Sequence, residues 1–336
     1  MPETHPSHEP SPQGPGAGPR AHAERPELSL VLPIFNEEPV IDELHRRLGE
    51  FLAQVGTTWE VIFVDDGSKD RSFPMLKALA EGEPRHRLIS FARNFGHQFA
   101  ITAGIDYARG QAVVVMDADL QDPPEVVSEM LDRFRDGFDI VHGVRRKREK
   151  ESVFKRATAY LFYRLLRAMV GITVPVDAGD FRLMSRRVVL TFRALRETSR
   201  FVRGMVAWVG FRQTTVLYDR KARFAGETHY PLSKMLKFAF DGITAFSIVP
   251  LRVATFLGFL AGVVGVGVAA WALYGRFYGF IVPGWATIMI TVSLGASAQL
   301  LMTGILGEYV GRIYEEVKRR PLYIVAEEVN ATREER

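Results

Sequence analysis

AVVVMDADLQDPPE, residues 112–125, is an apolar run that ends in alternating acids. In an extended chain, side chains two residues apart point to the same side. We therefore expect Asp117, Asp119 and Gln121 to converge at the end of a strand. Such oxygen ligands suit Mg²⁺ or Mn²⁺, and Mg²⁺ commonly completes its shell with substrate phosphates, such as those of a nucleoside diphosphate.

The structural alternative is a strand-to-helix turn in which Asp122, before two prolines, caps the next helix. That alternative accounts for Asp122. It does not account for Asp117 and Asp119, because a strand end has no structural need for two like charges. We therefore predict a metal site at Asp117, Asp119 and Gln121, while a D-x-D pattern by itself matches many unrelated sequences.

Outward from this stretch, apolar strands alternate with helical segments. We predict strands at 28–34, 59–64, 87–91, 112–116 and 138–142, and helices that end near residue 55 and span 95–108 and 124–135. This alternation is typical of an α/β fold with a mostly parallel sheet covered on both faces. In such sheets ligands bind beyond the carboxyl ends of the strands. The polar clusters at 36–38, 65–68 and 117–121 all fall there and predict one site.

Asp65-Asp66-Gly67-Ser68 follows the second predicted strand. One interpretation is a turn with a helix N-cap at Gly67 and Ser68. The other gives a carboxylate to the base or ribose of a nucleoside. The two interpretations are compatible.

Composition restricts the chemistry. The 336 residues include no cysteine, which excludes disulfides, thiol nucleophiles and cysteine metal sites. Residues 1–26 are rich in Pro, Gly, His and Ser and contain no apolar run, so we expect a disordered tail without a secretory signal.

Two long uncharged stretches lie near the C-terminus. There are 23 residues between Arg252 and Arg276 and 31 between Arg276 and Glu308 without a charged side chain. As helix, 23 residues reach about 34 Å, enough to cross a membrane. We predict two transmembrane helices at about 253–275 and 283–306, joined as a hairpin. The alternative, a pair of buried core helices, seldom stays apolar all round for this length.

Basic residues flank both ends of this hairpin, and only Arg276 lies in its connection. This asymmetry predicts a multi-pass protein of the cytoplasmic (inner) membrane. Both termini, and the domain that precedes the hairpin, would lie on the cytoplasmic side. The flanking residues are Lys234, Lys237, Arg252, Arg312, Lys318, Arg319 and Arg320. Glycines four apart, at 258 and 262 and at 307 and 311, suggest close helix contact and a homo-oligomer formed through these helices.

Residues 145–150, RRKREK, contain five basic side chains in six, and an amphipathic helical pattern follows from 152 to 168. A second amphipathic pattern covers 232–246. Basic amphipathic helices lie in the membrane interface. The alternatives are a solvated face or nucleic-acid binding for the charges, and ordinary packing on the sheet for the helix. We expect no nucleic-acid partner, because no base-reading module is present.

Together, PIFNEE at 33–38, VDDGS at 64–68 and DADLQDPPE at 117–125 resemble family 2 glycosyltransferases with the GT-A (Rossmann-like) fold. The resemblance is closest to the dolichol-phosphate mannose synthase group, and within it to bacterial polyisoprenyl-phosphate hexose (glucosyl) transferases. It extends to GDFRLM at 179–184, AWVG at 207–210 and the C-terminal hairpin. It implies a GT-A catalytic domain at 27–231, a juxtamembrane amphipathic helix at 232–247, two transmembrane helices within 248–307 and a cytoplasmic tail at 308–336.

The resemblance also implies roles for residues. Nucleotide-sugar binding falls to the first strand end, the two acids after the second, and the acidic stretch: Pro33, Phe35, Asn36, Glu37, Asp65, Asp66, Asp117, Ala118, Asp119 and Gln121. Phosphate or acceptor binding falls to Arg145, Arg220, Arg223, His229 and Lys234. The catalytic residues would be Asp119, Asp180 and Arg223, with Mg²⁺ or Mn²⁺ as cofactor.

One position departs from the family pattern. His229 stands where the arginine-glycine-lysine loop usually has lysine, and histidine is only partly charged at pH 7. Phosphate binding would then depend on Arg223 and Arg220, on nearby Lys234, or on a His229 protonated by the phosphates themselves. Asp180 has two interpretations as well: a base or orienting group, or an acid paired with Arg182 or capping the next helix.

The predicted reaction transfers a hexose from a UDP-glucose-like or GDP-mannose-like donor to undecaprenyl or dolichyl phosphate, with inversion and release of nucleoside diphosphate. A lipid phosphate is already mostly dianionic at pH 7 and needs no strong general base. The alternatives are a phosphoglycosyl transferase, which would release nucleoside monophosphate, and a non-catalytic membrane scaffold. We find no Q-x-x-R-W motif, which disfavours polymer synthesis.

Overall fold

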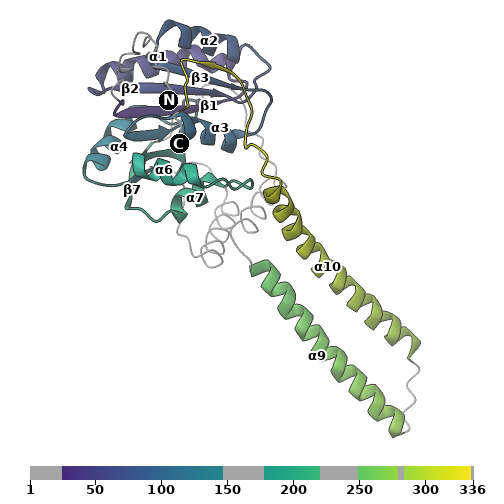
Figure 1. Ribbon diagram of the computed structural model, residues 1–336. Coiled ribbons are helices and arrows are strands. Elements are labelled where there is room, and N and C mark those ends of the chain that lie inside the picture. The colour runs from purple at the N-terminus through teal and green to yellow at the C-terminus, as the bar shows by residue number, and fades with distance from the viewer. Residues whose placement is uncertain (1–24, 147–177, 220–248, 279–283, 334–336) are drawn as a thin grey trace, which may run out of the picture.

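A computed structural model describes residues 25–146, 178–219, 249–278 and 284–333 (Figure 1). One eight-stranded sheet forms the centre of the domain, in the order β7-β5-β6-β4-β1-β2-β3-β8. Its strands are β1 (Leu28–Ile34), β2 (Trp59–Asp65), β3 (His86–Phe91), β4 (Ala112–Val115), β5 (Ile140–Arg145), β6 (Ala178–Ser185), β7 (Gln213–Tyr218) and β8 (Val325–Val329). The helices are α1 (Glu38–Gln54), α2 (Ser72–Gly82), α3 (His97–Tyr107), α4 (Val126–Arg135), α6 (Arg186–Ala194), α7 (Val202–Trp208), α9 (Val249–Phe277) and α10 (Trp285–Val317).

The predicted α/β class is confirmed. The five predicted strands and the helices between them are present, with ends shifted by at most three residues. Strands β1 to β4 are parallel to their neighbours among themselves, while β6 runs antiparallel to both β4 and β5. The sheet is therefore mostly parallel, with its antiparallel members beyond the central strands.

Alternation along each strand divides the core into two layers. Leu28, Leu30 and Leu32 of β1 pack with α1, α2 and α4 on one face. Val31, on the opposite side of the same strand, packs with α3, α6 and α7 on the other. All four side chains are fully buried, as expected for strands covered on both faces.

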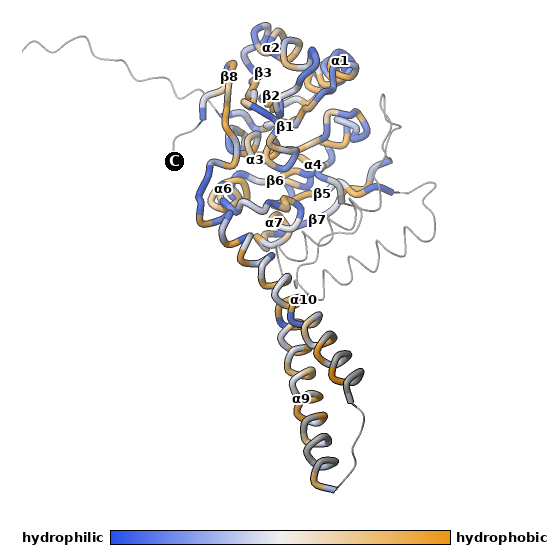
Figure 2. The backbone as a smooth tube through the Cα atoms, turned by 90° about the vertical axis from the view of Figure 1, so that its right-hand side faces the viewer, coloured by the Kyte–Doolittle hydropathy of each residue, from blue (hydrophilic) through white to orange (hydrophobic). Residues whose placement is uncertain are grey.

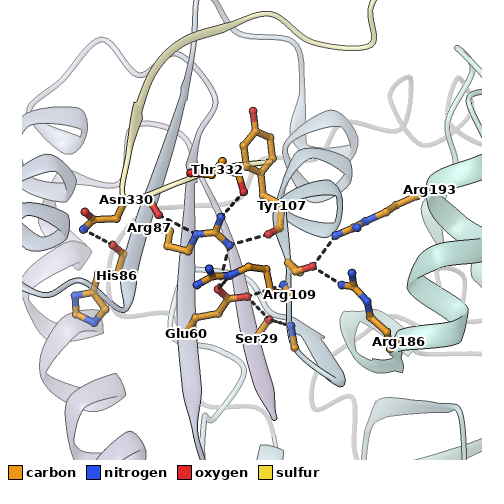
Figure 3. Close-up of polar contacts among 12 residues, drawn as sticks. Ser29, Glu60, His86, Arg87, Tyr107, Arg109, Arg186, Arg193, Asn330 and Thr332 are labelled. Atoms are coloured by element: carbon orange, nitrogen blue, oxygen red, sulfur yellow. Dashed lines mark hydrogen bonds and ion pairs between the residues drawn. The ribbon is translucent and has the colours of Figure 1, made fainter. Parts of the chain in front are cut away.

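The C-terminal segment returns to this domain. Residues 308–336 are predicted from the sequence as a tail without a strand, but β8 pairs antiparallel with β3 and forms an edge of the sheet. Figure 3 shows the buried guanidinium of Arg87, from β3, donating to the backbone carbonyls of Asn330 and Thr332 at 3.1 and 2.8 Å. It also pairs with Glu60 of β2 at 3.0 Å. The chain after α10 is thus fixed to the catalytic sheet.

Helices α9 and α10 run side by side as a long antiparallel pair that projects from the domain (Figure 1), and Figure 2 shows apolar colouring along much of both. Within the described residues, one stretch is long and apolar enough to cross a membrane, Val249–Val268 in α9. In α10, the side chains at 285–287, 289, 290 and 293 lie outside the described residues. The two-helix membrane hairpin is therefore not confirmed, and its second span stays a prediction.

Several predictions lie outside the described residues. These are most of the N-terminal tail, the amphipathic segments 152–168 and 232–246, and the four phosphate-loop residues Arg220, Arg223, His229 and Lys234.

Candidate active site

A cleft of about 460 Å³ opens beyond the carboxyl ends of β1, β2, β3 and β4. Parallel strands end at the same edge, so the loops that follow them meet there. Twelve residues line the cleft: Pro33, Ile34, Phe35, Glu37, Asp66, Asn94, Gly96, His97, Ala100, Asp117, Ala118 and Asp119. Seven of these were predicted from the sequence as nucleotide-sugar ligands.

The two acids after β4 share this cleft, but Gln121 is not among the lining residues. The prediction that all three would converge assumed that the strand continues through them. Instead β4 ends at Val115, and Leu120 adopts a left-handed backbone with φ of 60°. Period-two alternation therefore stops before Gln121, whose backbone N–H donates to Asp119 Oδ1 at 3.1 Å.

The surroundings of Asp117 suit a divalent cation. Its Oδ1 is buried and accepts no hydrogen bond, an arrangement that is costly unless a further ligand is bound. Burial is the largest cause that raises the pKa of Asp117, to about 6, and a cation would reverse that shift. Among the described residues there is no group of three or more His, Cys, Asp or Glu side chains arranged to hold a metal. A cation here would take oxygen atoms of Asp117 and Asp119 and complete its shell from elsewhere.

His97 connects the acidic pair to a second carboxylate. It is the first residue of α3, and its Nε2 lies 3.4 Å from Asp117 Oδ1 and 3.4 Å from Asp180 Oδ2. Burial alone would lower the pKa of His97, but the hydrogen bond with Asp180 and the charge of Asp117 outweigh it and raise the pKa. The imidazole therefore stays protonated to a higher pH than usual.

Asp180 is almost fully buried between cations. Arg203 donates to its two oxygens at 3.0 and 2.9 Å, and Arg182 lies at 3.4 Å. Burial opposes its ionisation, yet His97 and Arg203 lower the pKa of Asp180 well below its ordinary value. The pairing with Arg182, one of the two interpretations from sequence, is confirmed. Asp180 does not line the cleft, and its role as a base or an orienting group stays a prediction.

Asp66 and Asp65 have different tasks. Asp66 lines the cleft and accepts the backbone N–H groups of Phe95 and Gly96 at 2.7 and 2.9 Å. Burial, partly offset by these bonds, raises the pKa of Asp66. Asp65 instead accepts the Ser90 hydroxyl at 2.8 Å, which links β2 to β3. Of the two acids predicted for the nucleoside, Asp66 is the one at the cleft.

The loop after β1 is fixed by hydrogen bonds to the loop after β2, and these bonds lie outside the cleft. Asn36 has a φ of 54°, donates its N–H to Ser68 Oγ at 3.0 Å, and accepts the N–H of Lys69 at 2.8 Å. It does not line the cleft, in contrast to the prediction, whereas its neighbours Phe35 and Glu37 do. Phe35 is 40% exposed, and an exposed aromatic ring at a cleft offers a face on which a base could stack.

Arg145 is the last residue of β5. Its guanidinium contacts the hydroxyl of Tyr218, which in turn donates to Asp122 at 2.5 Å, and its Nε is buried without a hydrogen-bond partner. It does not line the cleft. Arg145 is thus linked through Tyr218 to Asp122, in the turn that follows Asp117 and Asp119, and its predicted contact with phosphates stays a prediction.

The segment Asn94-Phe95-Gly96-His97 was missed from the sequence. It follows β3 as the other polar clusters follow β1, β2 and β4, so the same rule would have found it. Gly96, with φ of 110°, lets α3 begin at His97 directly beside Asp117.

A mostly parallel sheet with a paired-acid cleft at its carboxyl edge places the domain in the GT-A-like α/β class. The model of glycosyl transferase family 2 matches residues 29–192, and the chain belongs to this family and is a glycosyltransferase. It is 50% identical to the uncharacterized glycosyltransferase YkcC of Bacillus subtilis over 89% of this chain and 93% of that protein. It is 37% identical to the prophage bactoprenol glucosyl transferase homolog of Escherichia coli, over 89% and 98%. The mannosyltransferase PcManGT of Pyrobaculum calidifontis, solved with GDP-Man and Mn²⁺, is similar in structure with a TM-score of 0.44 and 20% identity, over 83% and 88%.

Proposed function

We propose that this glycosyltransferase moves a hexose from a nucleotide-sugar to a polyprenyl phosphate at the membrane. The observation that carries the proposal is the cleft in which Asp117, Asp119 and His97 meet at the carboxyl ends of four parallel strands. The relative named as a bactoprenol glucosyl transferase homolog, which this chain matches over 98% of that protein, supports a lipid-phosphate acceptor and a glucosyl donor.

In the proposed reaction, a phosphate oxygen of the lipid forms a bond to the anomeric carbon. The bond from that carbon to the nucleoside diphosphate breaks, and its electron pair leaves with the diphosphate, so the configuration inverts. The attacking phosphate is already mostly dianionic at pH 7, so no side chain must remove a proton from it. A reaction without a general base agrees with the acids of the cleft, because Asp117 lies beside His97 and, with Asp119, is proposed to hold a metal ion.

The residues of the cleft bind and orient the donor. Phe35 and Glu37, with Asp66 and the loop that it fixes, would surround the nucleoside. Asp117 and Asp119 would hold Mg²⁺ or Mn²⁺, which would supply positive charge against the diphosphate. His97, kept in place by Asp180, adds a proton-bearing group beside the same phosphates.

The proposal is tested with the purified full chain, Mn²⁺, a panel of UDP- and GDP-sugars, and undecaprenyl phosphate. We expect a lipid-linked hexose together with nucleoside diphosphate. Release of nucleoside monophosphate would instead establish a phosphoglycosyl transferase, and absence of product with every donor would support a scaffold.

A matched pair of variants addresses the acids. Asp117→Asn should lower turnover by roughly 100-fold, as loss of one preorganised electrostatic group does in other enzymes. Asp132→Asn makes the same change on α4, where the side chain is 72% exposed, and should leave turnover unchanged. Equal activity of the two variants would remove Asp117 from the site.

For the membrane, we propose that α9 and α10 both span it, with the domain on the cytoplasmic side. The apolar side chains of both helices face outward, among them Phe259 at 71%, Trp271 at 72% and Leu300 at 73% exposed. Exposure of this extent suits a lipid environment. The absence of native cysteine allows single-cysteine labelling in spheroplasts. An impermeant maleimide should label Tyr278→Cys directly and Arg85→Cys only after lysis; labelling of both before lysis would contradict the orientation.

A further inference from the structure

A second cleft, of about 1060 Å³, lies where α10 joins the catalytic domain. Its walls come from the end of α10, from the segment that leads to β8, from the loop after α6, and from Arg333 after β8. Four arginines line it: Arg196, Arg319, Arg320 and Arg333. It shares no lining residue with the candidate active site. We call it the arginine cleft.

Contacts between distant segments build this cleft. The backbone N–H of Thr198 donates to Glu316 of α10 at 2.8 Å. Asp106 of α3 is buried and accepts from Arg196 at 2.8 and 3.1 Å and from the hydroxyl of Tyr323 at 2.8 Å. These contacts fasten the loop after α6 to α10 and, through Asp106, to the segment that leads to β8.

Positive charge in the arginine cleft exceeds the negative charge that could neutralise it. Asp106 pairs with Arg196 and also with Arg333, at 3.3 Å. Within the described part of the chain, no carboxylate lies within ion-pair distance of Arg319 or Arg320, and the lining contains a single acid, Glu316. Glu315 forms its hydrogen bond with Lys318, which lowers the pKa of Glu315, and the charge of Arg320 contributes to this shift only at longer range. Two exposed guanidinium groups thus remain available at the cleft.

Further positive charge lies behind this lining. Arg200 is largely buried, and its Nε and Nη2 have no hydrogen-bond partner. The charges of Asp106 and Arg196 both act on it, which places it close to the same cluster. An oxyanion in the cleft would be stabilised by this charge as well, since such interactions are weakly screened when buried.

The position of the cleft along α10 indicates where its ligand comes from. The outward apolar side chains of α10 continue to Ile313, Tyr314 and Val317, which are 62%, 62% and 71% exposed. Directly after Val317 the chain becomes Lys-Arg-Arg, and Arg319 adopts a left-handed backbone with φ of 48° that ends the helix. Glu308, Arg312, Glu315 and Glu316 lie among these apolar residues, so this end of α10 lies beyond the predicted span, in the flank where Lys and Arg gather on the cytoplasmic side of a membrane.

We propose that the arginine cleft binds the headgroup phosphate of an anionic membrane lipid. Guanidinium groups match phosphate oxygens through paired hydrogen bonds, and basic pockets beside membrane helices on the cytoplasmic side bind such headgroups. Free phosphate shares this chemistry, and the placement beside the apolar end of α10 favours the lipid. The inference rests on the proposed membrane position of α10 and is independent of the transfer chemistry.

The test is native mass spectrometry of the full chain in detergent, titrated with phosphatidylglycerol, with phosphatidylcholine, and with inorganic phosphate. We expect a one-to-one complex with phosphatidylglycerol alone. Arg319→Gln/Arg320→Gln should weaken it by about 30-fold, since each basic side chain near an anionic surface contributes about 1 kcal/mol and 1.4 kcal/mol is tenfold.

Lys318→Gln is the matched control, because it removes one charge at the same level but does not line the cleft. Because the Lys318 ammonium is already paired with Glu315 at 2.6 Å, its loss should weaken binding by less than about threefold, against roughly fivefold for Arg320→Gln alone. The proposal that the arginine cleft is the binding site would be overturned by either of two results. One is an equal loss of lipid affinity in Lys318→Gln and Arg320→Gln, and the other is a double variant that binds the lipid as the wild type does. Binding of inorganic phosphate as tight as that of the lipid would overturn the membrane source.

Hexosyl transfer measured in detergent without anionic lipid separates this inference from the proposed function. The double variant should retain wild-type turnover there. Loss of lipid binding with intact turnover supports the cleft, whereas a wild-type chain without turnover that still binds phosphatidylglycerol would refute only the proposed reaction.

Discussion

Replacing Arg87 with methionine should destabilise the catalytic domain and release its C-terminal strand. The guanidinium is fully buried and donates to four acceptors on three segments: Glu60 at 3.0 Å, and the carbonyls of Tyr107, Asn330 and Thr332 at 2.7, 3.1 and 2.8 Å. Figure 3 shows it at the centre of this network. Methionine fills a similar volume but donates to none of them.

The size of the destabilisation depends on the hydrogen bonds that Glu60 keeps after Arg87 is replaced. Removing one partner of a buried ion pair costs roughly 3–5 kcal/mol, because the other charge stays buried. Glu60 would keep the Ser29 hydroxyl at 2.6 Å and the Arg109 backbone N–H at 2.7 Å, so the loss should lie near the lower end. For a domain of this size 3 kcal/mol corresponds to a melting temperature lower by about 6–12 °C.

Thermal unfolding of the full chain in detergent measures this change, with Arg109→Met as the control. Arg109 also pairs with Glu60, at 3.1 Å, but its side chain is 38% exposed, so its loss should cost less than about 1 kcal/mol. Hydrogen exchange should show faster exchange in β8 for Arg87→Met alone. A melting temperature within about 2 °C of wild type, with β8 still protected, would refute the reasoning.

Three further predictions concern separate parts of the domain. A Cβ on Gly104 would lie 2.1 Å from Val31 Cγ1, so Gly104→Ala should cost roughly 1–3 kcal/mol by chemical denaturation, whereas Gly49→Ala, with open space around it, should not destabilise. Burial lowers the pKa of His142 to about 4, so the unfolded chain binds more protons below pH 6.5. The stability that this group contributes is present above that pH and is lost as the pH falls toward 4, by roughly 1 kcal/mol at pH 5.5, and His142→Gln should abolish this pH dependence. Asp180→Asn should lower stability by roughly 3 kcal/mol, because it leaves buried cations uncompensated; near-normal stability with lost turnover would instead support direct catalysis.

Much of the sheet was predictable because it depends on local pattern. Apolar runs at β1 to β5 are bounded by polar turns, and the acids after β4 stand out against a strand end. Strand β6 was missed because its sequence, AGDFRLMS, mixes buried Phe181 and Leu183 with Arg182 and Asp180. Those polar side chains are buried only because they pair with one another and with Arg203, which local pattern does not show.

The sequence by itself determined the family, the central parallel strands, the Asp117–Asp119 pair and the apolar character of the C-terminal helices. Each of these follows from residues close together in the chain, where periodicity and strand geometry apply. Only the tertiary structure decided that Gln121 does not line the cleft, that His97 stands between Asp117 and Asp180, that β8 completes the sheet, and that four arginines meet beside α10. These depend on contacts between segments far apart in sequence, which side-chain packing and buried charge pairing select and which no local period encodes.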